Sequence, residues 1–350
     1  MPLPPLIGHE RVKSRLAGAL ASAKLPQALL LVGPRGVGKQ RLALWLAQLI
    51  HCEAPVGQEP CGECRSCRLV LSLQHPDVHW FVPIELSKRA GGAGGVDVDK
   101  QVELAAEALG EEMAARRDQP LYPPTAGLAS HPVAAVRLLL KRLALTPAMG
   151  KRKVFVVGDA ERLIPQLGTE VAANALLKAL EEPPADSVII LTAADPNALL
   201  PTILSRVVLV RVARIADSDV TAFAQQTLGI ANKAELAQRV TAAEGCVGKL
   251  FATPGTRSGQ PGEDQAARFL EAPWLFALGQ VPFQARGGFT DMLDALASRL
   301  RSEAKRGGET DKLVEAIALV LDARDMAQGN VNPQLLAAVL AEDLRASRAS

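Results

Sequence analysis

Short apolar runs alternate with helical patterns between residues 27 and 212. Residues 27–32 (QALLLV) form one such run, and residues 39–52 follow it with apolar side chains at helical spacing. Further runs that predict buried strands lie at residues 78–83, 153–157, 187–193 and 207–212, and helical patterns lie between them at residues 133–145 and 170–182. Strands that alternate with helices predict an α/β domain, in which a parallel sheet is covered by helices on both faces.

The pattern is different in residues 84–130. This segment contains the sequences AGGAGG and QPLYPPTAG together with many charged residues. Low hydrophobicity and glycine-rich stretches of this kind do not supply a packed core. We therefore expect a flexible insertion on the surface of the α/β domain, with a short helix near residues 100–117.

The C-terminal part of the chain has only helical patterns. Residues 213–252 carry two of them, residues 253–264 (TPGTRSGQPGED) have the composition of a linker, and the pattern is helical again to residue 346. We expect three domains: an α/β domain at residues 1–212, a small helical domain at 213–256 and a separate all-α domain at 257–350.

Composition places the chain among ordinary globular proteins. Its 350 residues exceed one compact core, and the 48% hydrophobic and 22% charged content argues against disorder. A net charge of +2 gives no reason to expect a strongly nucleic-acid-binding surface overall, although it leaves room for a local patch. Neither a secretory h-region nor an apolar stretch of membrane-spanning length is present, so we expect a cytoplasmic protein without a membrane segment.

Residues 33–40 (GPRGVGKQ) nearly match a nucleotide-binding loop, in the strand–turn–helix context that such a loop requires. In a working loop, backbone N–H groups surround the phosphates, a lysine reaches their outer oxygens, and a Ser or Thr hydroxyl binds Mg²⁺. The phosphate cradle is kept by Gly33, Gly36, Gly38 and Lys39. Gln40 replaces the small hydroxyl, and its longer side chain displaces the ligand atom from the octahedral geometry of Mg²⁺.

The second position on the metal side is also altered. The stretch KVFVVGDAERL (153–163) should carry an acidic residue at the end of a strand, but Gly158 stands there and Asp159 follows at the position of a water-activating carboxylate. Mg²⁺ neutralises the charge that develops on a transferred phosphoryl group, so efficient hydrolysis by this chain alone is not expected. Two states of the loop stay open: ATP binding without hydrolysis, or a glycine turn without a ligand.

Four of the five cysteines are crowded into residues 52–67 with the spacing C-x8-C-x2-C-x2-C. They are Cys52, Cys61, Cys64 and Cys67. In a reducing compartment this spacing predicts a closed, structural zinc site, the alternative being four free thiols. His51 or His75 could replace one ligand. Cys246 stands among apolar residues and glycines, which predicts a small buried hydrophobic side chain.

Several stretches together resemble the clamp-loader AAA+ proteins, and within them the δ′ (delta-prime) subunits of bacterial DNA polymerase III. Besides the four-cysteine module, they are IGHERVKSRL (7–16), LPQALLLVGPRGVGK (25–39), HPDVHW (75–80), LTPAMGKRKVFVV (145–157), NALLKALEEPP (174–184) and LLPTILSRVVLV (199–210). These stretches run in family order and cover roughly residues 6–212. The resemblance implies an AAA+ P-loop parallel-sheet domain, a small helical lid, and an all-α collar domain for oligomerisation.

The resemblance also assigns roles to single residues. Clamp loaders carry a Ser-Arg-Cys motif whose arginine reaches the ATP of a neighbouring subunit, and Ser205-Arg206-Val207 matches it except for the cysteine. A guanidinium beside a γ-phosphate stabilises the spreading negative charge, which makes Arg206 a candidate arginine finger in trans. On spacing alone, Arg206 is equally a surface arginine in a salt bridge. Thr192 corresponds to the sensor-1 region and Lys249 to the sensor-2 arginine of the lid.

By this resemblance the chain is a non-hydrolysing subunit of the DNA polymerase III assembly. The implied partners are γ/τ-type ATPase subunits, a δ subunit, the β sliding clamp and, through the complex, primed DNA. One alternative is an autonomous AAA+ ATPase in which Lys39 and Asp159 do the chemistry. Another is a zinc-stabilised nucleic-acid-binding module, for which only three Trp, one Tyr and eight Phe are available for stacking.

Overall fold

The chain divides into two compact units, one that ends at Phe251 and one that is C-terminal to it. The computed structural model describes residues 3–84, 97–119, 129–163, 170–251, 261–278, 286–305, 310–327 and 332–349. Each unit is described by itself below.

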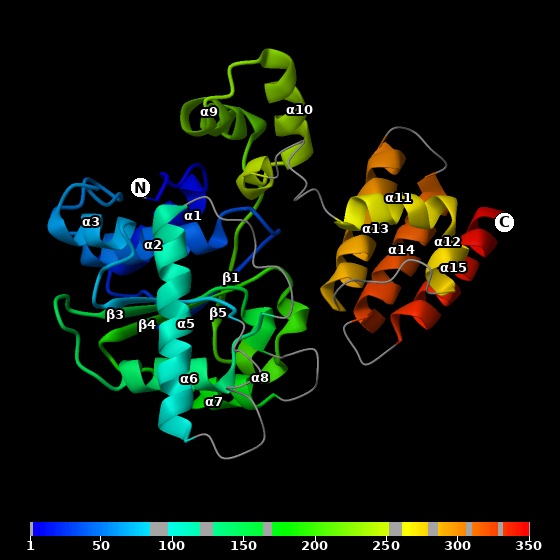
Figure 1. Cartoon of the computed structure of the whole chain (residues 1–350). Helices are drawn as coiled ribbons and strands as arrows, with labels where there is room; N and C mark the ends of the chain where they lie inside the picture. The colour runs from blue at the N-terminus through cyan, green and yellow to red at the C-terminus, as the bar shows by residue number, and fades with distance from the viewer. Residues whose placement is uncertain are drawn as a thin grey trace. The chain divides into compact units, whose positions relative to one another are not determined.

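A five-stranded sheet lies at the centre of the first unit (Figure 1). The strands are β1 (Ala28–Val32), β2 (Val78–Phe81), β3 (Lys153–Val157), β4 (Ser187–Ala193) and β5 (Val208–Arg211). They lie in the order β2-β3-β4-β1-β5, and every neighbouring pair is parallel. All residues of β3 and β4 are buried, which explains why their sequences are continuous apolar runs without alternation. All five predicted strands are present, but the prediction of burial was wrong for β5, in which Val208 and Leu209 are exposed.

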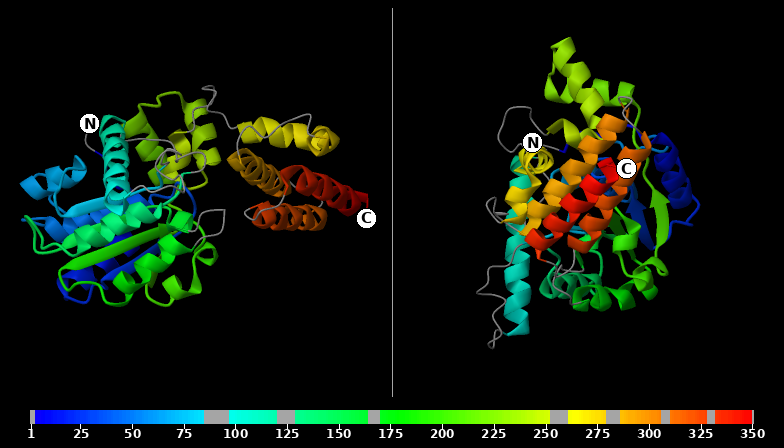
Figure 2. Two further views of the ribbon diagram at one scale, coloured as in Figure 1. Left: turned by 60° about the horizontal axis from the view of Figure 1, so that its bottom comes forward. Right: turned by 90° about the vertical axis from the view of Figure 1, so that its right-hand side faces the viewer.

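Helices cover both faces of this sheet. Figures 1 and 2 show α1 (Glu10–Ala21), α2 (Lys39–His51) and α3 (Arg65–Leu71) on one side, and α6 (Val133–Leu143), α7 (Val171–Glu181) and α8 (Pro201–Leu204) on the other. Within each layer, consecutive helices pack on one another. Two 3₁₀ turns, η1 (Ala160–Leu163) and η2 (Pro196–Ala198), follow β3 and β4. One continuous hydrophobic core joins the sheet to both layers, with Leu30, Phe155 and Ile190 fully buried.

The segment predicted as a flexible insertion contains a long, packed helix. This helix, α5 (Val98–Asp118), lies where a short helix was expected, and its buried residues Val102, Ala105 and Leu109 belong to the main core. The Arg116 guanidinium lies 4.5 Å from the ring centre of Trp80 in β2, an arrangement in which the ring face attracts the cation. The helix therefore packs against the β2 side of the sheet.

The two ends of this segment meet at one point. The backbones of Ile84 and Ser130 exchange hydrogen bonds of 2.9 and 3.2 Å in an antiparallel bridge. Closure of this kind lets a long segment leave and re-enter a fold without disturbing it. The remaining residues of the predicted insertion, 85–96 and 120–128, lie outside the described residues.

A small helical group follows β5 in the same unit. It consists of α9 (Asp217–Leu228), α10 (Lys233–Ala243) and the 3₁₀ turn η3 (Val247–Phe251), and it has a hydrophobic cluster of its own. The Asn232 side chain caps α10 by accepting hydrogen bonds from two backbone N–H groups of its first turn. The two helical patterns of residues 213–252 are present as α9 and α10.

All the regular elements among the described residues of the C-terminal unit are helices. It contains α11 (Pro261–Glu271), α12 (Pro273–Ala277), α13 (Arg286–Lys305), α14 (Thr310–Ala327) and α15 (Pro333–Ala349). Phe269, Phe276 and Phe289 lie in its core, and the first two rings meet edge to face. None of the described helices combines the length and the hydropathy that a membrane span requires. The predicted fold class, an α/β parallel-sheet domain with a helical lid and an all-α C-terminal domain, is confirmed.

Candidate functional site

The loop of residues 33–38 joins β1 to α2 at the carboxyl end of the sheet. Gly38 precedes α2 with a φ of 101°, a left-handed conformation that a side chain would strain. Lys39 is buried, and its Nζ donates hydrogen bonds to the carbonyl oxygens of Gly33 at 2.7 Å and Pro34 at 3.0 Å. Burial lowers the pKa of Lys39, and nearby carboxylates oppose that shift. The lysine is therefore hydrogen-bonded to its own loop.

Gln40 and Gly158 occupy one space. The Gln40 side chain lies so close to Gly158 that a Cβ added to the glycine would stand 2.7 to 2.9 Å from three of its atoms. Real Cβ atoms do not approach other atoms so closely, so an acidic side chain at position 158 requires the outer end of the Gln40 side chain to move. The Gln40 Oε1 is buried without a hydrogen-bond partner in the described part of the chain. The two departures from a magnesium site are thus one packing arrangement.

Asp159 follows β3 in a left-handed conformation, with a φ of 49°. This is uncommon outside glycine and is held here by a hydrogen bond of 3.1 Å from the Asp159 N–H to the Thr192 hydroxyl. Thr192 is fully buried in β4. Thr192, the residue that corresponds to sensor 1, therefore contacts the backbone of Asp159, the candidate water-activating carboxylate.

Glu161 is an acidic residue that the sequence reasoning missed. It lies in η1, its Oε1 accepts a hydrogen bond of 3.3 Å from the Ala194 N–H, and its Oε2 is buried without a partner among the described residues. Burial, reinforced by Asp159, raises the pKa of Glu161. The only sequence signal was an acid two positions after Asp159, which on its own is common on surface turns.

The buried side chain of His131 contacts the turn that follows β3. The His131 Nε2 lies 2.7 Å from the Gly158 carbonyl oxygen. Because a carbonyl oxygen only accepts hydrogen bonds, Nε2 carries the proton. Complete burial lowers the pKa of His131 to about 4, so the ring is neutral at pH 7.

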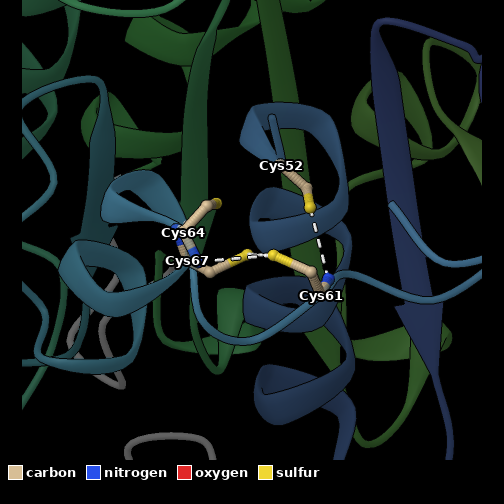
Figure 3. A group of neighbouring side chains, drawn as sticks. All are labelled: Cys52, Cys61, Cys64 and Cys67. Atoms are coloured by element: carbon tan, nitrogen blue, oxygen red, sulfur yellow. Dashed lines mark hydrogen bonds between the residues drawn. The ribbon is translucent and has the colours of Figure 1, made fainter. Parts of the chain in front are cut away.

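The four cysteines meet at the other end of α2 (Figure 3). Cys52 directly follows α2, Cys61 lies in the next loop, and Cys64 and Cys67 lie at the start of α3. All four Sγ atoms are within 4.8 Å of one another, and those of Cys61 and Cys67 are 3.9 Å apart. Four thiolates on one tetrahedral Zn²⁺ would be about 3.8 Å apart, given Zn–S bonds of about 2.3 Å. The geometry therefore fits zinc.

Backbone N–H groups already point at these sulfurs. Cys61 donates to the Cys52 Sγ at 3.2 Å, Cys64 to the Cys61 Sγ at 3.3 Å, and Cys67 to the Cys64 Sγ at 3.4 Å. The Cys64 N–H lowers the pKa of the Cys61 thiol to about 6, whereas burial raises the pKa of the Cys67 thiol. The amides favour thiolates, and a bound cation would complete that stabilisation.

Other contacts around the cysteine loop involve acidic and histidine side chains. Glu59 accepts hydrogen bonds from the Lys13 Nζ of α1 at 2.8 Å and from the Trp45 Nε1 of α2 at 2.7 Å. His51 and His75, named as possible replacement ligands, pack ring against ring with centres 4.2 Å apart. The group that could hold a metal in the described residues consists of the four cysteines. Cys246 is fully buried, as predicted.

Arg206 lies at the opposite end of the sheet from the phosphate loop. It precedes β5, whose Val208 pairs with Leu29 at the amino end of β1, whereas the loop leaves the carboxyl end of β1. The Arg206 Nε donates to the Glu181 Oε1 at 2.7 Å, and the side chain is 28% exposed. The salt bridge that sequence reasoning held as an alternative is therefore present, and Arg206 is not beside this chain's own loop.

Lys249, the candidate sensor-2 residue, has its side chain turned to a carboxylate. Its Nζ donates to the Glu244 Oε2 at 2.9 Å, and 42% of the side chain is exposed. Its backbone is nearer the phosphate loop, because the N–H of the preceding Gly248 donates a 2.8 Å hydrogen bond to the Gly36 carbonyl oxygen. The backbone of Gly248 therefore contacts the phosphate loop, whereas the Lys249 side chain is paired with Glu244.

Comparison with known proteins gives a consistent set of relatives. The chain is 35% identical over 196 residues to DNA polymerase III subunit delta' of Pseudomonas aeruginosa, which covers 56% of this chain and 44% of that protein. It is 31% identical to subunit delta' of Bacillus subtilis (56% and 45% covered) and 29% identical to subunit tau of Escherichia coli K12 (57% and 24% covered). Each match therefore spans less than half of the relative's own length.

A protein-family model described as "DNA polymerase III, delta subunit" matches residues 8–216, which is more than half of the chain. The matched region contains the phosphate loop, the four cysteines, the Gln40–Gly158 contact and Arg206. The chain therefore belongs to the DNA polymerase III, delta subunit family.

Proposed function

We propose that the chain is a δ′-type clamp-loader subunit, an AAA+ protein that does not hydrolyse ATP itself. It would act in the cytoplasm with γ/τ-type ATPase subunits and a δ subunit to place the β sliding clamp on primed DNA. Membership of the family and the delta' and tau relatives support this assignment. The observation that carries it is the Gln40 side chain packed against Gly158.

The proposed lack of hydrolysis follows from that contact. Phosphoryl transfer depends on Mg²⁺ to neutralise the developing charge, and neither Gln40 at the loop nor Gly158 after β3 supplies the side chain expected to hold the ion. Lys39 keeps its place in the cradle with Gly33, Gly36 and Gly38. A nucleotide in that cradle would be bound without its protein metal ligands and would not be turned over.

The proposed contribution to catalysis is made by Arg206 in trans. Its position at the amino end of the sheet supports action on a neighbour's nucleotide, because the chain's own loop leaves the carboxyl end. An arginine finger accelerates phosphoryl transfer by about 10³- to 10⁵-fold at the site it serves. Arg206 is the residue for which we propose a catalytic role.

The four cysteines are proposed to bind one structural zinc ion. Cys52, Cys61, Cys64 and Cys67 would supply four thiolates, which leaves no open coordination position for a substrate. The ion would hold the loop between α2 and α3 and take no part in the reaction.

Reconstitution tests this function. The chain is mixed with γ/τ-type and δ subunits from the same source, and complex formation and DNA-stimulated ATP hydrolysis are measured for the wild type, Arg206→Ala and the control Arg211→Ala. We expect all three to assemble, and only Arg206→Ala to lose nearly all turnover at the neighbouring site. Failure to form a stoichiometric complex would contradict the clamp-loader assignment, and unchanged turnover of Arg206→Ala would contradict the finger.

A further inference from the structure

Arg206 is held by a side chain from another helix. Glu181, the last residue of α7, accepts hydrogen bonds through one carboxylate oxygen from both Nε, at 2.7 Å, and Nη2 of the guanidinium. The remaining nitrogen, Nη1, donates to the Thr202 carbonyl oxygen at 2.7 Å and to the Ser205 hydroxyl at 3.2 Å. All three guanidinium nitrogens are therefore engaged within this chain.

Glu181 gains little from its own helix. The carboxyl end of a helix carries a partial negative charge, so an acidic residue in the last turn of α7 is electrostatically unfavourable. The chain nevertheless places Glu181 and Glu182 there, directly before Pro183. The contact with Arg206 offsets the unfavourable position of Glu181, whereas the side chain of the neighbouring Glu182 is exposed.

The ion pair between Glu181 and Arg206 is weak enough for another anion to replace the carboxylate. Glu181 is 47% exposed and Arg206 28% exposed, and ion pairs with this much solvent contribute about 0 to 1 kcal/mol. A triphosphate presents several negatively charged oxygens to the same fork of N–H groups and is the stronger acceptor. A phosphate brought close to Arg206 can therefore displace the carboxylate at low cost.

We infer that Glu181 is a positioning residue that holds Arg206 within its own chain until a phosphate of a neighbouring subunit competes for the guanidinium. The Glu181–Arg206 pair is present in the isolated chain. The competing phosphate, by contrast, comes from a neighbouring subunit, so this part of the inference rests on the proposed function. Removal of the carboxylate should free the arginine and leave the fold intact, because both side chains lie at the surface. Two experiments separate these parts.

The first experiment uses the chain alone. Phenylglyoxal reacts with accessible, unpaired guanidinium groups, and the rate at Arg206 is followed by peptide mass spectrometry in the wild type, Glu181→Gln and the neighbouring control Glu182→Gln. We expect Arg206 to react severalfold faster in Glu181→Gln alone, and the difference to shrink in 1 M salt, which screens the wild-type pair. Equal rates in all three proteins would overturn the inference.

The second experiment uses the assembled complex and measures kcat and the apparent KM for ATP. Since Glu181 competes with the phosphate, Glu181→Gln should lower the apparent KM for ATP and leave kcat unchanged. The expected decrease is about two- to fivefold, which corresponds to the free energy of one surface ion pair. In an Arg206→Ala background the same substitution should change nothing, because Glu181 acts through Arg206. An unchanged or higher KM in Glu181→Gln, while Arg206→Ala still loses turnover, overturns this inference and leaves the proposed function standing. No effect of Arg206→Ala at all refutes the proposed function instead.

Discussion

At its amino end α2 carries Lys39 and Gln40 beside Gly158, and at its carboxyl end it delivers Cys52 to a group of four thiols. At the first end the Gln40 amide side chain lies against Gly158. At the second end the four sulfurs lie within 4.8 Å of one another, and the 3.9 Å between Cys61 and Cys67 is close to the separation that a tetrahedral zinc ion requires. One helix thus joins the candidate phosphate loop, for which we propose no bound Mg²⁺, to a group of four cysteines that could hold a metal ion.

The difference shows that loss of ligands at one end does not relax the rest of the fold. The glycine turn, the buried lysine and the supporting Thr192 and His131 contacts are all present around the altered position. We interpret the amino end of α2 as a kept scaffold and the carboxyl end as a stabilising centre. Each prediction below tests one side of this contrast.

The largest effect is expected at the carboxyl end. Cys67 is fully buried, and Cys67→Ala would remove one of four proposed zinc ligands. We expect the bound zinc, about one equivalent by mass spectrometry, to be lost and the free energy of unfolding to fall by more than about 4 kcal/mol, the range for loss of a structural metal. Cys246→Ala, which changes an equally buried cysteine outside the group, should keep the zinc. A folded metal-free wild type would refute the zinc site.

A smaller effect is expected from pH at the amino end. The pKa of His131 is about 4 in the fold and about 6.5 when the chain is unfolded, so the unfolded chain binds the additional proton between those values. Stability should therefore fall as the pH drops from 6.5 to 4, by about 3 kcal/mol from His131 alone, and this loss should be absent above pH 7. The free energy of unfolding, measured with urea at each pH across this range, should change less steeply with pH in His131→Asn than in the wild type. An identical slope would show that the ring is not held neutral.

The Gln40–Gly158 contact gives the next prediction. Gly158→Asp should lower the free energy of unfolding by about 1 to 3 kcal/mol, because its Cβ meets the Gln40 side chain. Gln40→Ser in the same chain should recover most of that loss, which a double-mutant cycle in urea measures. Gly110→Asp, at an exposed glycine with nothing within 4 Å of an added Cβ, is the control for a new carboxylate. Additive effects of the two substitutions would contradict the shared space.

The smallest effect concerns the contact between the cysteine loop and the helices. Burial alone would lower the pKa of Lys13, but its bonds to Glu10 and Glu59 outweigh burial and raise it. Glu59→Gln should therefore cost about 1 kcal/mol, since it removes a charged partner from a largely buried lysine. The exposed Glu63→Gln in the same loop should be neutral. Equal thermal midpoints of these two variants would contradict a tethering role for Glu59.

The positions of the strands and the close grouping of the four cysteines are the features that the sequence predicted well. Strands β3 and β4 are short apolar runs in which every residue is buried, and the cysteines lie close together in sequence, so that local spacing carries the information. The Gln40–Gly158 and Arg206–Glu181 contacts join residues far apart in the chain, and no local period marks them. Helix α5 was predicted, but its packing was missed: the glycine-rich and charged composition of residues 84–130 hid the buried Val102, Ala105 and Leu109, and an apolar pattern does not indicate an arginine buried against Trp80.

The most direct test of the contrast is ATP hydrolysis by the purified chain alone, in the presence of Mg²⁺, compared with Lys39→Ala. Because Gln40 and Gly158 replace the two side chains that are expected to hold Mg²⁺, we predict that phosphate release by both proteins equals that of a protein-free control. Mg²⁺-dependent turnover by the wild type that Lys39→Ala abolishes would contradict the account.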